Sequence, residues 1–239
     1  MEGKDVDTYV LKYQNRWVKY GPNLAAPRDP VLFEGARLLV RRIVGKRLIA
    51  TYVDGDFVTS QLLQIVKPFE AADAKYLLAV LNSTLVAYYF RKKYNRLDKT
   101  FPEIRIYELE SIPVPRIAPA AQAPFTDQAD LLLQKHRELH EGTSTFLRLL
   151  QANFPLATVP KKLEEWHRLE WKEFLEEMTK AKAPLKPSQQ KEWLAVFEEQ
   201  QKVAGHALAA IEQADRELDR MVYALYELTE AEIALVEGN

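Results

Sequence analysis

The fold is decided by residues 31–68, which read VLFEGARLLVRRIVGKRLIATYVDGDFVTSQLLQIVKP. Three of its segments are rich in apolar and β-branched side chains, which favour strands: residues 37–44, 48–53 and 61–67. Asp54 and Gly55 tolerate the positive φ angles of a tight primed turn, so we expect a hairpin over residues 51–59. This stretch therefore predicts a small antiparallel sheet.

Helical patterns follow the predicted sheet. Residues 71–81 and 84–94 predict two helices, and Asn82-Ser83 separates them because these side chains compete for backbone hydrogen bonds. Residues 104–107 predict a further strand. The first half of the chain is therefore expected to be a mixed α/β lobe.

Prolines mark a boundary near the middle of the chain. Five of the 13 prolines lie between residues 102 and 124, where missing amide donors and fixed φ angles disfavour long helices. We place a Pro/Ala-rich linker at residues 117–126, between a lobe of residues 1–116 and a helical domain of residues 127–239.

The second half is rich in Leu, Glu, Lys, Gln and Ala, which favour helices. Three helices are predicted, at residues 127–150, 163–180 and 188–225. In the longest, an apolar residue recurs every seven positions but forms only half a seam, so a small bundle is favoured over a two-stranded coiled coil. Thr229 and Glu232 predict a capped last helix. The expected fold class is α+β, a mixed lobe followed by a mainly helical bundle with one long helix.

Composition excludes several classes of protein. The 239 residues are 47% hydrophobic and 28% charged and contain no cysteine, which excludes disordered, collagenous and disulfide-rich chains. The longest nearly apolar stretch, residues 77–90, is too short and too polar to span a bilayer. Residues 1–7 lack the apolar core of a secretory signal. We expect a cytoplasmic protein without a membrane segment.

The sequence shows no recognisable catalytic or metal site. It has no glycine-rich phosphate loop and no Cys/His cluster. His136 and His140 share a helix face, but solvated surface explains them better. Glu170-Trp171-Lys172 resembles part of a metal nuclease site, yet it lies in a helical pattern with no strand-borne Asp before it. We expect no catalytic residue, no metal and no cofactor in this chain, and an enzyme with an unrecognised site is the weaker alternative.

Charge is divided unevenly along the chain. Residues 1–116 hold 19 Lys and Arg against 13 Asp and Glu, whereas residues 117–239 hold 14 against 21. Two basic clusters account for the excess. The first consists of Arg28, Arg37, Arg41, Arg42, Lys46 and Arg47. The second consists of Arg91, Lys92, Lys93, Arg96, Lys99 and Arg105, and it is interleaved with Tyr88, Tyr89, Tyr94 and Phe101. Clustered cations are what phosphate contacts require, and arginine also reads guanine edges. The expected DNA-binding residues are Arg41, Arg42, Lys46, Arg47, Arg91, Lys92, Lys93, Arg96, Lys99 and Arg105.

A structural interpretation of the same residues stays open. The aromatic side chains of residues 88–90 would then be core, and the basic residues would solvate the end of their helix.

Four segments, in order, resemble one known family. They are residues 31–68, YLLAVLNSTLVAYYF at 76–90, FPEIRIYELESIPVP at 101–115, and ADRELDRMVYALYELTEAEIALVE at 214–237. Together they resemble the TaqI-like C-terminal specificity domain of adenine-specific DNA methyltransferases and type IIG restriction-modification enzymes. Glu227 departs from the pattern, because the family commonly has Gly there. Glycine would allow a left-handed helix end, so we expect that end to be built differently in this chain.

The resemblance implies a target-recognition module that binds double-stranded DNA and positions a methyltransferase domain or subunit. In the family, that preceding domain binds S-adenosylmethionine and carries the catalytic motif, which is absent here. Gly3-Lys4-Asp5 resembles a segment usually found well inside such proteins, so we expect a fragment, a split subunit or an excised piece. The resemblance implies neither the DNA target nor whether a nuclease is attached. The alternative is a helical assembly module whose basic lobe binds an acidic protein partner.

Overall fold

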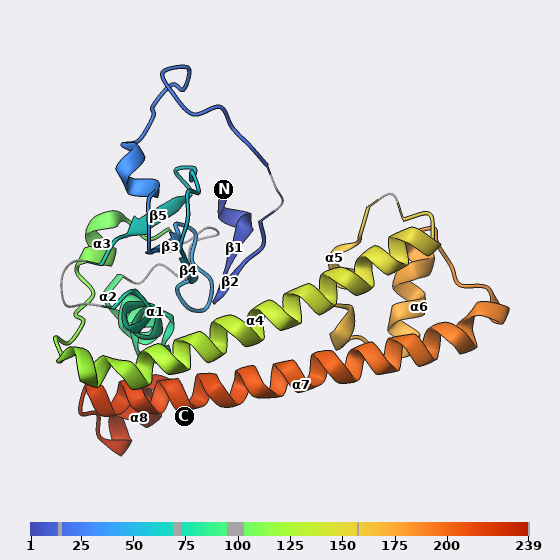
Figure 1. Cartoon of the computed structure of the whole chain (residues 1–239). Coiled ribbons are helices and arrows are strands. Elements are labelled where there is room, and N and C mark those ends of the chain that lie inside the picture. The colour runs from blue at the N-terminus through green and yellow to red at the C-terminus, as the bar shows by residue number, and fades with distance from the viewer. Residues whose placement is uncertain (14–15, 69–72, 95–102, 157, 239) are drawn as a thin grey trace. The chain divides into compact units, whose positions relative to one another are not determined.

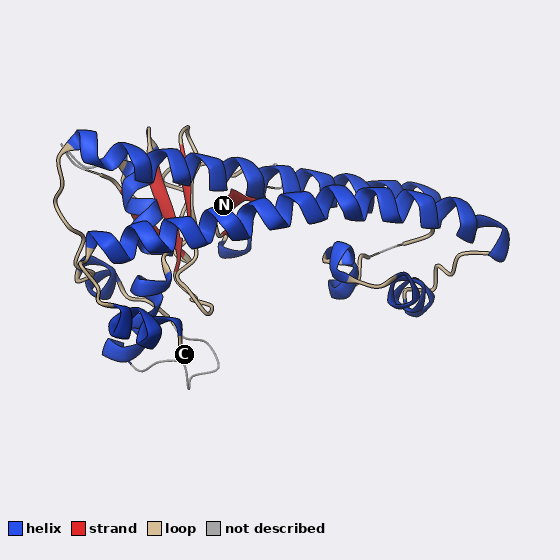
Figure 2. Ribbon diagram, turned by 90° about the horizontal axis from the view of Figure 1, so that it is seen from below, coloured by secondary structure: helices blue, strands red, loops and turns tan. Residues whose placement is uncertain are grey.

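The computed structural model describes residues 1–13, 16–68, 73–94, 103–156 and 158–238 (Figure 1). The chain divides into two units. The first unit contains residues 1–134 and 213–239, and the second contains residues 135–212. All strands of the described part lie in the first unit, and helices make up most of the remainder (Figure 2). The predicted α+β fold class with one long C-terminal helix is therefore confirmed.

The larger sheet has β3 (Arg37–Arg41) at its centre, between β4 (Ala50–Val53) and β5 (Leu63–Val66). Both neighbours run antiparallel to β3, so that Leu39 faces Thr51 on one side and Ile65 on the other. Four consecutive β3 residues are buried, and successive side chains of a strand point to opposite faces, so both faces of the sheet are covered at its centre. The three segments predicted as strands are thus confirmed in type, although each strand is shorter than its prediction.

A two-stranded sheet extends this core. It consists of β1 (Val6–Asp7) and β2 (Val10–Leu11), and the Tyr9 N–H between them donates to the Ala50 carbonyl of β4 at 3.0 Å. Val6 packs with residues of all three longer strands in one hydrophobic cluster. The start of the chain is therefore part of the lobe core.

The hairpin predicted over residues 51–59 is wrong. A turn does form, with Gly55 at φ 121°, but residues 57–59 form no strand, and β4 pairs with β3 instead. Long-range contacts occupy the backbone of the expected second strand. The Arg37 guanidinium donates to the Phe57 carbonyl at 3.1 Å, and Met1 bonds both the Val58 carbonyl and the Ser60 N–H.

Helices α1 (Ala74–Asn82) and α2 (Thr84–Tyr94) confirm the two predicted helices. Asp73 caps α1 by accepting the Lys75 N–H at 2.7 Å. The strand predicted at residues 104–107 is wrong, because α3 (Ile106–Glu110) begins within it. Glu108 causes this change, since its carboxylate accepts the Arg105 N–H at 2.7 Å and stabilises the first turn of the helix.

Helix α4 (Pro119–Asn153) begins eight residues before the predicted start at 127, inside the segment expected to be a linker. Pro119 occupies the first turn, where a missing N–H leaves no intrahelical bond unmade. Gln122 docks this turn, since its side chain accepts the Asp73 N–H at 2.8 Å and donates to the Ile117 carbonyl at 3.1 Å. The prediction of a linker rested on the number of prolines. It could not include these contacts, because they depend on the tertiary structure.

The helix predicted over residues 163–180 is divided. The structure has α5 (Lys161–Glu164), a 3₁₀ turn over residues 166–168 and α6 (Trp171–Lys180). Trp166 in that turn is buried, and its ring lies 3.9 Å from the ring of Phe146 on α4. The chain therefore leaves the helical path where it inserts a tryptophan into the core of the second unit.

That core is aromatic and belongs to the second unit alone. Its large buried side chains come from α4, the turn, α6 and α7 (Pro187–Leu225). They include Phe146, Phe154, Trp166, Phe174, Trp193 and Phe197. The start and end of α7 agree with the prediction within one residue. No helix of the described ranges is both long and apolar enough to cross a membrane.

The end of α7 corrects one expectation. Glu227 adopts φ 54°, the left-handed conformation that the family reaches with glycine. Its N–H donates to the Ala224 carbonyl and the Leu228 N–H to the Tyr223 carbonyl, both at 3.1 Å, which is a Schellman end. The helix end is thus built in the usual way, but on a non-glycine residue. The capping box of Thr229 and Glu232 is confirmed at the start of α8 (Glu230–Glu237).

Candidate nucleic-acid interface

Three consecutive cations occupy the last turn of α2: Arg91, Lys92 and Lys93. Lys92 and Lys93 are exposed and Arg91 is half-buried. Cations at a helix C-terminus interact favourably with the helix dipole, so this placement stabilises α2 as well as presenting charge. We call these three residues together with Arg105 the α2–α3 cationic end.

Aromatic hydroxyl groups hold Lys93 in place. Its Nζ donates to the Tyr89 hydroxyl at 2.6 Å and lies 5.1 Å from the Tyr89 ring centre and 5.4 Å from that of Tyr94. The hydrogen bond to Tyr89, the largest cause, raises the pKa of Lys93. The Tyr94 and Ser111 hydroxyls are 2.5 Å apart, which links the end of α2 to the end of α3. Lys93 is therefore a fixed cation at neutral pH.

Lys92 lies over Tyr88, with 5.5 Å between its Nζ and the ring centre. Both aromatic contacts are made by lysines of the same helix, and Phe90 is buried against Tyr94. Of residues 88–90, only Phe90 is a core residue, whereas Tyr88 and Tyr89 are half-buried beneath the lysine side chains. The ammonium groups of Lys92 and Lys93 nevertheless remain on the exposed part of the lobe, where a phosphate can reach them.

Arg105 lies directly before the first residue of α3. It is exposed, and the next two residues are unusually exposed for apolar side chains, Ile106 at 64% and Tyr107 at 55%. Two residues earlier, Glu103 forms an ion pair with Arg42 at 2.9 Å. This ion pair therefore brings Arg42, from the first basic cluster, to the segment that carries Arg105.

Arg41 and Lys46 also belong to the first basic cluster, but they take no part in the ion pair between Arg42 and Glu103. Arg41 is half-buried at the end of β3, and Lys46 is exposed in the loop between β3 and β4. Neither forms an ion pair with a residue in the described ranges. Both keep their charge available.

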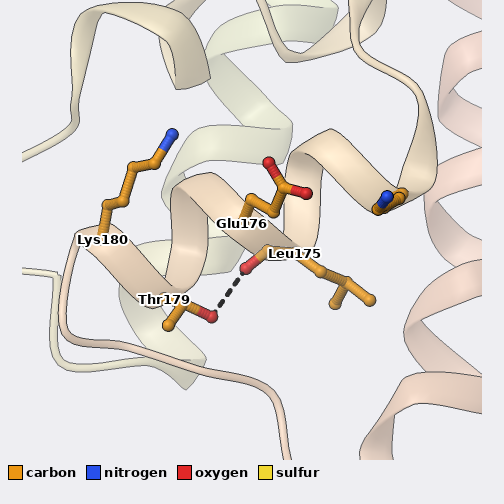
Figure 3. A pocket seen from close by; sticks show the side chains of 5 residues that line it. Leu175, Glu176, Thr179 and Lys180 are labelled. Atoms are coloured by element: carbon orange, nitrogen blue, oxygen red, sulfur yellow. Dashed lines mark hydrogen bonds between the residues drawn. The ribbon is translucent and has the colours of Figure 1, made fainter.

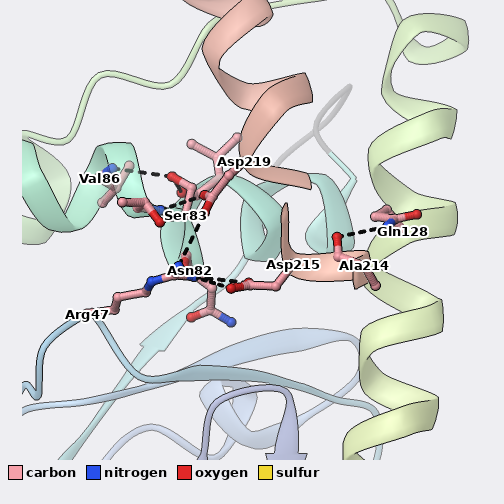
Figure 4. Close-up of polar contacts among 10 residues, drawn as sticks. Arg47, Asn82, Ser83, Val86, Gln128, Ala214, Asp215 and Asp219 are labelled. Atoms are coloured by element: carbon pink, nitrogen blue, oxygen red, sulfur yellow. Dashed lines mark hydrogen bonds and ion pairs between the residues drawn. The ribbon is translucent and has the colours of Figure 1, made fainter. Parts of the chain in front are cut away.

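Arg47 is engaged inside the lobe (Figure 4). One of its terminal nitrogens donates to both oxygens of Asp215, at 2.8 and 3.0 Å, and the other to Asp219 at 3.2 Å. Two other arginines of the first cluster are internal as well, since Arg37 is fully buried and Arg28 donates to the Leu63 carbonyl at 3.2 Å. Much of the first cluster therefore stabilises the lobe.

The remaining two predicted contacts, Arg96 and Lys99, lie outside the described residues, between the end of α2 and residue 103. No group of His, Asp or Glu side chains in the described ranges could hold a metal ion.

An open depression lies on α6 (Figure 3). Its lining residues are Lys172, Leu175, Glu176, Thr179 and Lys180. The Thr179 hydroxyl donates to the Leu175 carbonyl of its own helix at 2.8 Å, so it is not directed toward a ligand. The depression offers no set of converging polar groups.

Sequence reasoning missed the polar residues that join the elements. Asn82, Ser111 and Asp219 make contacts far along the chain, and no motif or periodicity in the sequence marks them. The available signal was their place inside the segments quoted for the family resemblance. The structure brings these segments into contact, as when Tyr226 donates to the Pro113 carbonyl and Tyr76 to that of Pro115.

Comparison with known families covers most of the chain in two parts. Residues 1–114 match the TaqI-like C-terminal specificity domain. Residues 118–222 match a family described as a domain of unknown function (DUF8810). No curated protein and no solved structure matches the chain. The first match contains both sheets, helices α1 to α3 and every residue predicted to contact DNA.

Proposed function

We propose, from the match of residues 1–114 to the TaqI-like C-terminal specificity domain, that this chain is a non-catalytic DNA specificity module. The family points to DNA sequence recognition in restriction-modification systems. The single observation that carries the proposal for this chain is the α2–α3 cationic end, which lies inside the matched region. The module recognises a short duplex sequence and positions a catalytic domain upon it.

The proposed contacts differ in their tasks. Lys92 and Lys93 are compact ammonium groups that suit phosphate oxygens, and they fix the orientation of the lobe on the duplex. Arg91 and Arg105 carry planar guanidinium groups that can also pair with a guanine edge through two hydrogen bonds. Arg41, Arg42, Lys46, Arg96 and Lys99 complete the proposed set. Arg47 is not part of the proposed set. It would have to give up its ion pairs with two carboxylates to bind one phosphate, which brings no net gain in binding free energy.

The proposed partner is an adenine-N6 DNA methyltransferase domain or subunit of a type IIG system, with or without a nuclease. S-adenosylmethionine is bound by that partner, whose chemistry requires the target adenine to leave the stack. The present chain contributes the choice of sequence. The proposed location of this activity is the cytoplasm.

Selection of bound duplexes tests the proposal. A pool randomised over about ten base pairs is offered at low and near-physiological salt, with and without a methyltransferase partner. Enrichment of one short sequence is expected. Salt-sensitive binding without enrichment, even with the partner, would overturn the proposal and favour the assembly module with an acidic protein partner.

A lysine pair separates phosphate contacts from general charge. Lys92→Ala is expected to weaken binding to all duplexes alike and to reduce the slope of log K against log salt by roughly one. Lys172→Ala is the matched control, because Lys172 is exposed on α6 in the second unit. Equal slopes for the two variants would exclude Lys92 from the interface.

A further inference from the structure

The last turns of α7 hold the first turn of α2. Asp219 accepts the Thr84 N–H at 2.7 Å with one carboxylate oxygen and the Thr84 hydroxyl at 2.5 Å with the other. Thr84 is the first residue of α2, whose first N–H groups have no partner inside the helix. Ser83 caps the helix locally, since its hydroxyl accepts the Val86 N–H at 3.2 Å (Figure 4). Asp219, 135 positions away along the chain, adds a long-range partner at the first residue of the helix.

The same contacts fix this helix start to the sheet. Arg47, in the loop before β4, donates to Asp215 and Asp219 and reaches the Asn82 carbonyl at 3.4 Å. The Asn82 side chain, fully buried, accepts the Ala50 N–H at 3.1 Å and donates to the Ala50 carbonyl at 3.0 Å. The loop, the end of α1, the start of α2 and α7 are therefore joined by one polar cluster. We call it the Asp219 cluster and define it as Arg47, Asn82, Thr84, Asp215 and Asp219.

Helix α2 connects this cluster to the cationic end. Its 11 residues rise about 15 Å from first to last, at about 1.5 Å per residue. A tilt of about 10° around Thr84 would move the last turn by about 3 Å over that rise. Groups that read a ligand must be held within about 0.5 Å, so the orientation of the first turn matters at the other end.

We propose that Asp219 is a positioning residue for DNA recognition, which sets the direction of α2 by capping Thr84 while Arg47 holds the carboxylate against the sheet. The inference rests on the proposed function and deepens it. It assigns the acidic end of α7 a role in sequence discrimination without any contact to DNA. An acidic side chain among phosphate-binding cations is unfavourable on the surface, and here it is engaged inside the lobe.

The test compares Asp219→Ala with Glu217→Ala, the matched control. Glu217 is an exposed acid two residues earlier on α7, paired only at the surface with Arg220 in the described structure. Binding is measured well below the melting temperature to the selected duplex and to a scrambled one. Asp219→Ala is expected to reduce the ratio of the two affinities about tenfold. Glu217→Ala is expected to leave the ratio unchanged, since non-specific binding depends on cations that both variants retain.

Two further variants keep the inference testable if Asp219→Ala does not fold. Asp219→Asn retains an oxygen that can accept the Thr84 N–H, so it is expected to recover most of the discrimination. Thr84→Val removes the hydroxyl bond at similar volume and is expected to lower the ratio in the same direction. An unchanged ratio in folded Asp219→Ala, or in Thr84→Val where the first does not fold, would overturn the inference.

Hydrogen exchange separates this failure from failure of the proposed function. If the wild-type chain prefers no DNA sequence, the proposed function is wrong. Whether Asp219 holds α2 is then judged from the hydrogen exchange of the α2 amides. Asp219→Ala is expected to accelerate exchange in the first turn of α2 at least tenfold relative to Glu217→Ala. Equal exchange in the two variants would show that Asp219 does not hold α2.

Discussion

Replacing Glu227 by glycine is expected to stabilise the first unit. Glu227 stands at the left-handed position of the Schellman end of α7, with φ 54°. Its side chain is exposed, so its removal uncovers no core. The left-handed conformation brings the Cβ of an L-residue close to the following carbonyl oxygen, whereas glycine has no Cβ.

The size of the effect follows from two opposing contributions. A non-glycine residue in this conformation costs roughly 1–2 kcal/mol. Glycine loses about 0.4–1 kcal/mol more than another residue in ordering its backbone. Glu227→Gly should therefore raise the free energy of unfolding by about 0.5–1 kcal/mol.

Urea unfolding followed by far-ultraviolet circular dichroism measures this change, with two comparison variants. Glu227→Ala keeps the Cβ and is expected to have no effect, so it separates backbone strain from loss of the carboxylate. Ala224→Gly, at an exposed position within the last turn of α7, should destabilise the helix by about 1 kcal/mol. If Glu227→Gly is no more stable than Glu227→Ala, the backbone-strain argument is refuted.

Three other changes address separate parts of the chain. Asn82→Ala, which leaves the buried backbone of β4 without its side-chain partner, should cost about 2–4 kcal/mol in urea unfolding, against less than about 0.5 kcal/mol for the exposed Asn153→Ala. The Thr229 N–H and hydroxyl lower the pKa of Glu232, so its contribution to stability is present above the ordinary pKa of glutamate and is lost as pH falls through the lowered value. The destabilisation caused by Glu232→Gln should accordingly be full at neutral pH and shrink below about pH 4, and a pH-independent difference would contradict this. Phe146→Ala should destabilise the second unit by about 3–5 kcal/mol, read from tryptophan fluorescence, and a cost below about 1 kcal/mol would show that this ring is not central to that core.

The sequence predicted those parts of the fold that depend on neighbours along the chain. The capping box at Thr229 needs only a residue three positions later, and it was recognised. The strand predicted at residues 104–107 was wrong although its cause is also local. Glu108 caps a helix there, and the β-favouring composition of the segment outweighed this signal in the prediction. The predicted hairpin after Gly55 does not form, because Met1 and Arg37 bond the backbone of its expected second strand. No local sequence pattern connects these two residues to that segment.

The candidate interface was predictable to the extent that it depends on composition. Clustered cations located the end of α2, and Lys92 and Lys93 are indeed exposed there. Composition does not show which cation already has a partner. Arg47 looked equivalent to its neighbours, and its two carboxylates come from 168 and 172 residues later. Pairing at that distance is decided by the fold and not by spacing.

These separations also bear on the order of events during synthesis. At about 5–20 residues per second, Arg47 is made roughly ten to thirty seconds before Asp215 and Asp219 exist. The second unit, residues 135–212, is completed within that interval and carries its own aromatic core. The strands of the lobe are therefore translated first, but the lobe can acquire its final contacts last. These contacts form when the end of α7 is made and its two carboxylates can pair with Arg47.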